Sequence, residues 1–396
     1  MTPTFDGDPY ATAVPSTVTD PMLERAKLVA LHAEGAFSVT ELAARAGVSR
    51  KTAYKWIARY RESGPDALAD RTHARHAQEH RTPPEVEALL VACREAHPSW
   101  GPRKLLPYLA RRHPEVVRWP AASTAGVLLD RHGLTKKRRP RRVPRHPGST
   151  PLMTTAPNDV WTADYKGQFR MGDGELCYPL TVRDAHTRFV LSCHGLPSVE
   201  QYAALRQFDV LFREYGLPAA IRSDNGTPFA TQALCGLSRL SVWWIKLGVD
   251  HQRIDPGQPQ QNGAHEQMHK VLKAETARPP ERDMASQQRR FDRWRAEFNE
   301  DRPHEALDYA TPASVYTPSR RPMPDVLPEP EYPGHFEVRY LSRDGNARFK
   351  TRQFFVSQTL AHEHVGFEEV GDGVWDLYFF DRLLARLDER DFELRG

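Results

Sequence analysis

The 396-residue sequence predicts a multidomain α+β protein, with helical units first, an α/β domain in the middle and a small β-barrel at the end. A chain of this length is too long for one core, so two to four domains are expected. Apolar residues recur at helical spacing up to residue 133, strand patterns joined by turns begin at residue 160, and alternating patterns fill the last sixty or so residues. The expected divisions are a disordered tail (1–20), two helical units (21–75 and 80–135), a basic linker (136–155), the α/β domain (156–318), a proline-rich linker (319–333) and the barrel (334–396).

The first helical unit contains two short helices with a tight turn between them. We expect Thr40 to cap a helix that runs to Ala46, Gly47 to form the turn and Ser49 to cap the next helix. This pattern predicts a helix-turn-helix, whose second helix enters the major groove of DNA. The packing side of that helix is expected to be Ala53, Trp56, Ile57 and Tyr60, and the DNA-binding candidates are Arg50, Lys51, Lys55 and Arg59. An ordinary helical hairpin is the alternative.

The second helical unit is predicted to hold three helices, at 85–96, at 103–112 and from Pro120 to Gly133. Pro107 falls inside the middle segment, so that helix is expected to start nearer Leu105 or Leu106. The unit is either a second DNA-binding domain or a helical spacer.

Positive charge is concentrated in the first part of the chain. Residues 1–150 hold 25 Lys and Arg against 15 Asp and Glu, which leaves 30 against 36 for the remainder. Such asymmetry favours a part that binds nucleic acid and a part that binds metal, although charge also keeps proteins soluble. The basic run 135–146 contains no acid and is expected to lie along DNA or to act as a solvated linker. Its DNA-binding candidates are Lys136, Lys137, Arg138, Arg139, Arg141 and Arg142.

The middle domain is predicted to begin with three antiparallel strands, followed by alternating helices and strands. The strands are expected at 160–167, 176–182, 189–193, 219–223 and 249–254, and the helices at 199–215, 262–276 and 285–300. This order is typical of a ribonuclease-H-like fold. Asp164 would lie in the central strand, Asp224 just past the end of a neighbouring strand, and Glu266 in the first turns of a helix.

Three acidic residues from separate elements can form one site for hard divalent cations. Mg²⁺ prefers carboxylate and phosphate oxygens. Two such ions can activate one oxygen and stabilise another during in-line attack at phosphorus. Asp164, Asp224 and Glu266 are therefore the predicted catalytic and metal-binding residues.

The segments around these acids resemble the integrase core of bacterial insertion-sequence transposases and retroviral-type integrases, the Asp-Asp-Glu family. The motifs are Trp161-Thr-Ala-Asp164, Ser223-Asp-Asn-Gly226 and the segment 256–263 that leads to Glu266, with a later likeness at 299–307 and 311–314. The resemblance implies two Mg²⁺ or Mn²⁺ ions per site, binding of transposon-end and target double-stranded DNA, cleavage of 3′ ends and their joining to target DNA. It also implies a homo-oligomer, a dimer or tetramer, on DNA. One departure is the 41 residues between Asp224 and Glu266, a longer separation than is usual in the family.

Several other polar residues lie near the three acids or in the same domain. Gln261, Asn262, Lys270 and Lys273 are DNA-contact candidates in the loop and helix around Glu266. His269 would contact a phosphate, pack in the interior or face solvent. Asp184 is expected to be a turn residue and His304 to be structural.

The sequence also argues against several classes of protein. No apolar run approaches the ~20 residues that span a bilayer, and residues 1–20 lack the features of a signal peptide. The four cysteines are widely spaced, which argues against a zinc finger or a disulfide framework and favours a reducing cytoplasm. The family resemblance implies that the cytoplasm is bacterial and the protein nucleoid-associated. Two functional alternatives remain, a helix-turn-helix regulator with an inert core and a nuclease of the same fold that does not join DNA.

Overall fold

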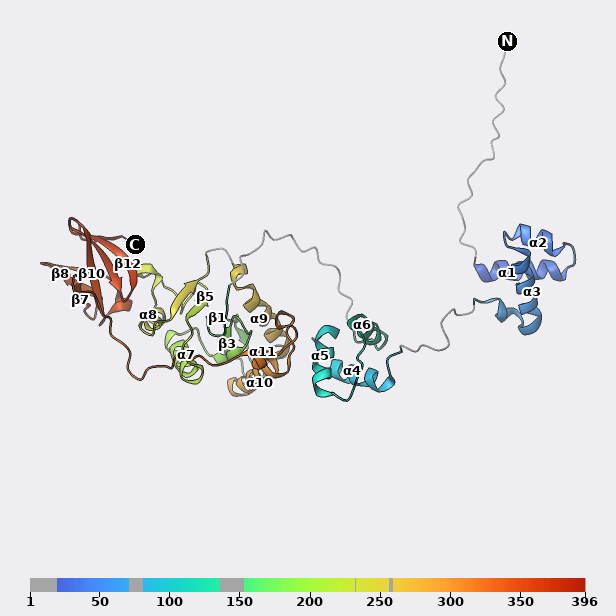
Figure 1. Ribbon diagram of the computed structural model, residues 1–396, viewed down its shortest axis with the longest axis horizontal. Coiled ribbons are helices and arrows are strands. Elements are labelled where there is room, and N and C mark those ends of the chain that lie inside the picture. Colours follow the sequence, from blue (N-terminus) through green and yellow to red (C-terminus); the bar gives the residue numbers. More distant parts are fainter. Residues whose placement is uncertain (1–19, 71–80, 136–152, 232, 256–258, 396) are drawn as a thin grey trace, which may run out of the picture. The chain divides into compact units, whose positions relative to one another are not determined.

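The computed structural model describes residues 20–70, 81–135, 153–231, 233–255 and 259–395 (Figure 1). The chain divides into two compact units, Met1–Arg81 and Thr82–Gly396. The predictions for the tail (1–20) and for the basic candidates Lys136, Lys137, Arg138, Arg139, Arg141 and Arg142 lie outside the described residues, apart from Asp20. Among the described helices, none has the length and apolar character that crossing a membrane requires.

The first unit is a helix-turn-helix. It consists of α1 (Pro21–Ala33), α2 (Val39–Arg45), α3 (Arg50–Ser63) and a 3-10 turn (Pro65–Leu68). Gly47 has a φ of +63°, and Ser49 caps α3 by accepting from the Thr52 N–H at 3.2 Å, both as predicted.

Two expectations for this unit were wrong. The cap of α2 is Ser38, which forms a reciprocal capping box with Glu41, and Thr40 already lies inside the helix. The carboxylate three residues after Ser38 satisfies the Ser38 N–H, and this second hydrogen bond favours the earlier start. Tyr60 is 41% exposed, whereas Ala53, Trp56 and Ile57 are buried as expected.

The second unit begins with three helices, α4 (Pro84–Ala96), α5 (Pro102–Arg112) and α6 (Ala122–Arg131). Their shared core surrounds Trp100, which is 1% exposed. The predicted late start of α5 was wrong, because Pro107 lies inside the helix. Proline there removes one helical hydrogen bond, and the burial of Leu105, Tyr108 and Leu109 in the same helix offsets that cost.

The α/β domain is built on a six-stranded sheet with the order β2-β3-β1-β5-β6, in which β4 also pairs with β3. Pairing is antiparallel between β1 and β3 and between β3 and β4, and parallel from β1 to β5 to β6. The strands are β1 (Val160–Tyr165), β2 (Phe169–Arg170), β3 (Leu176–Asp184), β4 (Val190–Leu196), β5 (Ala220–Ser223) and β6 (Asp250–Arg253). This is the predicted ribonuclease-H-like arrangement.

Helices cover both faces of this sheet. On one face, α7 (Gln201–Tyr215) and α8 (Arg239–Lys246) form the largest core with the strands. On the other face, α9 (Gly263–Thr276) and α10 (Met284–Ala296) pack through a second cluster that includes Phe291. Successive strand residues point to opposite faces of the sheet. Because helices pack on both faces, the strands carry apolar residues on both.

After α10 the chain makes one π-helical turn (Glu297–Asp301) and then the short helices Glu305–Leu307 and α11 (Pro312–Val315). Two further 3-10 turns lie at Leu234–Gly236 and Pro259–Asn262. Asn299 in the π turn accepts from the Val190 N–H at 2.8 Å and donates to the Val190 carbonyl at 2.9 Å. This side chain therefore pairs with β4 as a strand backbone would.

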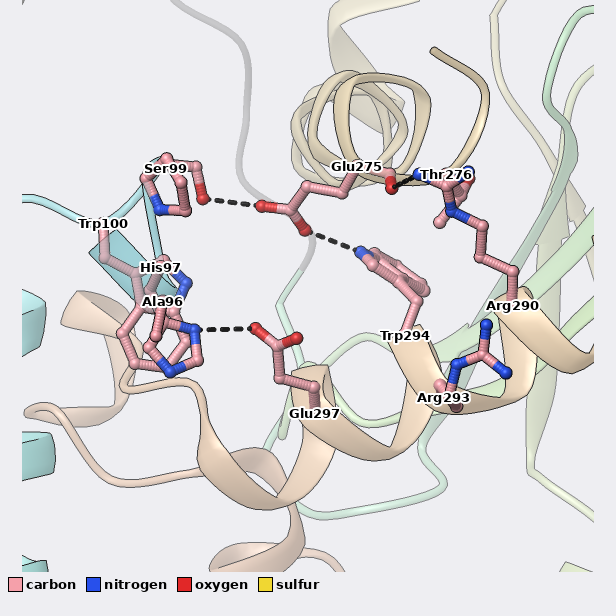
Figure 2. A pocket seen from close by; sticks show the side chains of 11 residues that line it. Ala96, His97, Ser99, Trp100, Glu275, Thr276, Arg290, Arg293, Trp294 and Glu297 are labelled. Atoms are coloured by element: carbon pink, nitrogen blue, oxygen red, sulfur yellow. Dashed lines mark hydrogen bonds and ion pairs between the residues drawn. The ribbon is translucent and has the colours of Figure 1, made fainter. Parts of the chain in front are cut away.

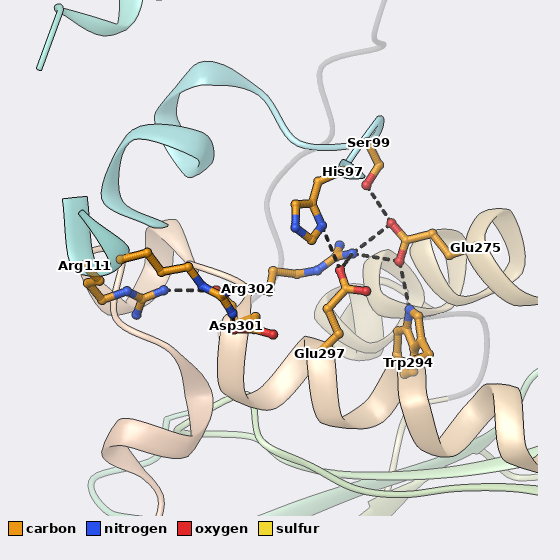
Figure 3. Close-up of polar contacts among 9 residues, drawn as sticks. His97, Ser99, Arg111, Glu275, Trp294, Glu297, Asp301 and Arg302 are labelled. Atoms are coloured by element: carbon orange, nitrogen blue, oxygen red, sulfur yellow. Dashed lines mark hydrogen bonds and ion pairs between the residues drawn. The ribbon is translucent and has the colours of Figure 1, made fainter. Parts of the chain in front are cut away.

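Helices α4–α6 contact the α/β domain around the buried side chain of Arg302. Glu275 accepts hydrogen bonds from Ser99 at 2.6 Å and from Arg302 at 2.7 and 2.8 Å, and Glu297 lies 3.3 Å from His97 (Figures 2 and 3). A pocket of about 340 Å³ opens beside these groups.

The last domain was predicted to be a small β-barrel; its strands are antiparallel, and among the described residues they do not close into a barrel. Five strands form an open antiparallel sheet, β13-β12-β11-β10-β7, and β8 pairs with β9 as a separate hairpin. The strands are β7 (Glu337–Tyr340), β8 (Asn346–Phe349), β9 (Arg352–Phe355), β10 (His364–Gly371), β11 (Val374–Phe379), β12 (Arg382–Asp388) and β13 (Leu394–Arg395), and a 3-10 turn (Gln358–Leu360) precedes β10. Closure is unnecessary because Phe349 of the hairpin packs on Phe367 and Trp375 and fills the core from the side.

Candidate active site

Asp164 lies near the end of β1, the strand between β3 and β5. Trp161 and Ala163 are buried in the core with α7 and α8. Because side chains alternate along a strand, Thr162 and Asp164 face the other side, toward α9. The carboxylate of Asp164 is partly buried there, opposite Thr181 of β3.

Asp224 directly follows β5, the parallel neighbour of β1. Its Oδ1 accepts from the Gly226 N–H at 3.2 Å, and a side chain at Gly226 would meet the Asp224 carboxylate at 3.2 Å. Asn225 donates from Nδ2 to the Ile254 carbonyl at 2.8 Å, which ties the turn to the end of β6. Asn225 and Gly226 therefore shape the turn that carries Asp224.

Glu266 lies in the first turn of α9 and is exposed. Burial, together with the negative charges of Asp224 and Glu266, raises the pKa of Asp164 to about 7. The Tyr165 N–H and the charge of Lys166 act in the opposite direction. After burial, Asp224 and Glu266 therefore both contribute to the raised pKa of Asp164.

Two histidines of α9 form a hydrogen-bond network beneath Asp164. The Thr181 hydroxyl lies 2.7 Å from His265 Nε2, 2.7 Å from His269 Nε2 and 3.0 Å from the Asp164 carbonyl. A carbonyl only accepts, so Thr181 donates its single proton to Asp164, and both imidazoles donate to Thr181 from Nε2. His265 Nδ1 lies 2.8 Å from the Thr162 hydroxyl, which also donates to the Arg183 carbonyl at 3.3 Å. The network fixes α9, and with it Glu266, against β1 and β3.

The side chains of Asp164, His265 and His269 bring possible metal-ligand atoms within 4.8 Å of one another. Both nitrogens of His265 are occupied by threonine hydroxyls, so His265 cannot bind an ion without breaking the network. His269 Nδ1 faces Asp164 Oδ2 at 3.7 Å. We therefore interpret His265 as a structural residue and not as a ligand.

The histidine network is the main feature that sequence reasoning missed. His265 was not considered, although His265 and His269 are four residues apart on a predicted helix and flank Glu266. Such a pair shares one face of a helix, and that spacing was the available signal. For His269 the packing interpretation holds, because the residue is 7% exposed and its Nε2 bonds to Thr181.

The other candidates near Glu266 divide into two groups. Lys270 and Lys273 are exposed on α9. Lys166, which the sequence analysis did not select, lies close to Lys273, and burial together with the charge of Lys273 lowers its pKa. Gln261 bonds instead to Asp255, with its amide nitrogen 2.6 Å from Oδ2, and Asn262 is buried at the start of α9.

In the first unit, the predicted DNA-binding residues lie on α3. Arg50, Lys51 and Lys55 are exposed, and the charged groups of Lys55 and Arg59 lie 5.1 and 4.8 Å from the centre of the Trp56 ring. Cation–π contacts of this kind hold the long side chains on the surface of the helix.

Asp184, expected to be a turn residue, is one. Its buried carboxylate accepts from the backbone N–H of Thr187 at 2.7 Å and of Asn158 at 2.8 Å.

Comparisons with known proteins agree with this architecture. Residues 154–259 and 247–312 match integrase core domains, residues 24–76 match a helix-turn-helix domain and residues 52–129 match a homeodomain-like domain.

Two curated relatives are insertion-element proteins. The chain is 31% identical over 162 residues to the uncharacterized 31.7 kDa protein of insertion element IS407 from Burkholderia multivorans, which covers 40% of this chain and 55% of that protein. It is 26% identical over 238 residues to the uncharacterized 39.2 kDa protein of insertion element IS476 from Xanthomonas euvesicatoria, with 58% and 63% covered. The chain therefore spans between half and two thirds of the length of these relatives.

Among solved structures, a chain of the simian T-cell lymphotropic virus intasome in complex with the PP2A regulatory subunit B56 gamma is similar, with 17% identity and a TM-score of 0.37. The alignment covers 69% of this chain and 97% of that chain. On these sequence matches, the chain carries an integrase core domain and helix-turn-helix domains and is similar to proteins of bacterial insertion elements.

Proposed function

We propose that this protein is a DNA transposase that binds the terminal inverted repeats of its element, cleaves their 3′ ends and joins them to target DNA. The placement of three carboxylates supports the proposal: Asp164 lies on β1, Asp224 follows the paired strand β5, and Glu266 lies in the first turn of α9, which His265 joins to β1. The pKa of Asp164 is raised by burial and by the charges of Asp224 and Glu266, so the cluster is short of positive charge. A binding protein has no need for such a costly group of acids.

These carboxylates suit divalent cations. Their oxygens are hard ligands, and bound cations would offset the mutual repulsion that the raised pKa of Asp164 reflects. Asp164, Asp224 and Glu266 would hold two Mg²⁺ or Mn²⁺ ions, which would supply activation of a water or a DNA 3′-hydroxyl and stabilisation of the leaving oxygen.

The chain's own residues would position the DNA. The network of Thr162, Thr181 and the two histidines keeps Glu266 in place relative to β1. Lys166, Lys270 and Lys273 form the basic side of the site and would bind backbone phosphates.

We propose that end recognition belongs to the helix-turn-helix. Arg50 and Lys51 lie exposed at the start of α3, the end of a recognition helix that contacts base edges. A homo-oligomer, a dimer or tetramer on DNA, would bring two ends and the target together.

A strand-transfer assay with Mg²⁺, duplexes that carry the candidate ends and a target plasmid tests the proposal. Asp164→Asn, Asp224→Asn and Glu266→Gln should each reduce joined product to the level seen without metal and leave DNA binding in a gel-shift assay unchanged. The control is Asp209→Asn, which removes an exposed acid of α7 that pairs with Arg213, and should join normally.

The products also separate the alternatives. Cleaved DNA without joined product would identify a nuclease, and DNA binding without either product would identify a regulator. Normal joining by any of the three active-site variants would remove that residue from the site.

A further inference from the structure

A cavity of about 260 Å³ lies between α5, β3 with the turn that follows it, α9 and the segment after α10. Four cationic side chains and one imidazole line it, and no carboxylate does so among the described residues. These five are Lys104 from α5, Arg183 from β3, Arg188 from the β3–β4 turn, and Arg302 and His304 from the segment after α10.

Two of the guanidinium groups are almost completely buried, and their hydrogen bonding is incomplete. Arg183 is 4% exposed and Arg302 is 2% exposed. The Nε of each, and Nε2 of His304, are buried without a hydrogen-bond partner in the part of the chain that the structure describes. Each unsatisfied buried nitrogen costs about 1–3 kcal/mol, so the protein's own groups do not fully satisfy the polar side chains around this cavity.

The charge around the cavity is not balanced. Glu275 pairs with Arg302, and the carboxylate of Asp184 acts on Arg183 and Arg188. Glu297 also lies 3.9 Å from Arg302, and Glu305 pairs with Arg103, so three acids against four cations leave a charge of +1.

The titration behaviour of the lining groups reflects the same excess of positive charge. Burial and then the charge of Arg188 lower the pKa of Arg183 to about 9. Burial and then the charge of Arg302 lower the pKa of Lys104. Burial lowers the pKa of His304 to about 3, with further contributions from Lys104 and both buried arginines, so this imidazole is neutral.

We propose that this cavity is a binding site for a phosphate group. A phosphate anion would offset the excess positive charge, and its oxygens would accept from the charged groups of the lining side chains Lys104, Arg183, Arg188 and Arg302. As HPO₄²⁻ it can also donate, and so it would fit His304 in either tautomer. The same chemistry is offered by free inorganic phosphate and by a phosphate of a DNA backbone. The site is separate from the three carboxylates and does not depend on the proposed catalysis.

The first test uses inorganic phosphate as the probe on the full chain. Isothermal titration and thermal melting in sodium phosphate, compared with sodium chloride of equal ionic strength, should show saturable binding and a raised Tm. Arg188→Gln should weaken phosphate binding about tenfold or more, as expected for the loss of one charge-assisted hydrogen bond. Lys104→Gln should act in the same direction and serves as a second variant if Arg188→Gln does not fold.

The matched control is Arg103→Gln, since Arg103 adjoins Lys104 on α5 but has an exposed side chain and does not line the cavity. It should bind phosphate as the unaltered protein does. Equal melting in phosphate and chloride, or equal losses in Arg103→Gln and Arg188→Gln, would overturn the proposal.

A second arm distinguishes the source of the phosphate. If the occupant belongs to DNA, Arg188→Gln also weakens binding of a random duplex and lowers the salt dependence by about one phosphate contact, and inorganic phosphate competes with the duplex. If the occupant is a free anion, duplex binding is unchanged while phosphate binding is lost. Either result supports the site. Normal joining activity in Arg188→Gln is compatible with both, so failure of this proposal and failure of the proposed catalysis are distinguishable.

Discussion

Glu275→Gln removes the charge that compensates Arg302 at the contact between α4–α6 and the α/β domain. The glutamate accepts from Arg302, from Ser99 at 2.6 Å and from the Trp294 indole at 2.8 Å (Figure 3). The substituted amide side chain would keep one acceptor oxygen and nearly the same volume. The change therefore tests charge and hydrogen bonding more than packing.

The expected loss in the free energy of unfolding follows from the burial of Arg302 and Glu275. The side chain of Arg302 is 3% exposed and that of Glu275 is 23% exposed. Removal of one partner of a buried ion pair costs about 3–5 kcal/mol, because the other charge stays buried without compensation. Since the amide retains an acceptor and Glu275 is partly solvated, we expect a loss of about 2–4 kcal/mol in the free energy of unfolding.

The assay is urea unfolding of the full chain, followed by tryptophan fluorescence at pH 7, and Glu297→Gln is the control. Glu297 is 37% exposed and lies 3.9 Å from Arg302, so its loss should cost no more than about 1 kcal/mol. If both variants lose less than about 1 kcal/mol, the argument from burial is refuted.

The pH dependence of stability gives an independent check on the pairing of Glu275 with Arg302. Burial favours the neutral form of Glu275, but the charge of Arg302 and the hydrogen bonds it receives outweigh burial and lower its pKa. A lowered carboxylate pKa stabilises the folded protein fully above the unfolded value of about 4.5 and loses that effect as the pH falls through the folded value. The difference in stability between the natural protein and Glu275→Gln should therefore shrink as the pH falls below about 4.5, and a constant difference would contradict the assignment.

Three further outcomes are expected. Thr181→Val removes the hydroxyl that accepts from His265 and His269, and should cost about 2–4 kcal/mol in urea unfolding, because two buried donors lose their partner; an unchanged midpoint would disprove the network. Phe367→Ala, at a fully buried position, should cost about 3–5 kcal/mol in the transition of the C-terminal domain, seen by calorimetry. Ser38→Ala breaks the capping box of α2 and should cost about 0.5–2 kcal/mol in the melting of the first unit, with no cost if the cap lies elsewhere.

Most elements of the fold could be predicted because their signals are local. The turn at Gly47, the cap at Ser49 and the alternating strands of the sheet depend on neighbouring residues. The errors arose where two local signals competed, as with Ser38 and Thr40, or where tertiary packing overrode a preference, as with Pro107 inside α5. The open sheet at the end could not be predicted, because alternation within strands does not say whether the outer strands pair.

The active site also combines residues that local motifs predict with residues that only tertiary contacts bring into play. Asp164, Asp224 and Glu266 could be selected because each has a distinctive motif, and their mutual influence became visible only in three dimensions. The role of His265 depends on Thr162 and Thr181, which are more than eighty residues away in the chain.

By itself, the sequence determined which segments become helices and strands, where acidic residues follow strands, and where basic residues lie on helices, since spacing and capping act between near neighbours. Only the tertiary structure decided that two threonines occupy both nitrogens of His265, that the last strands leave their sheet open, and that Arg183, Arg188 and Arg302 surround one cavity. Such contacts join residues far apart in the chain, and their energies depend on burial, which no local pattern specifies.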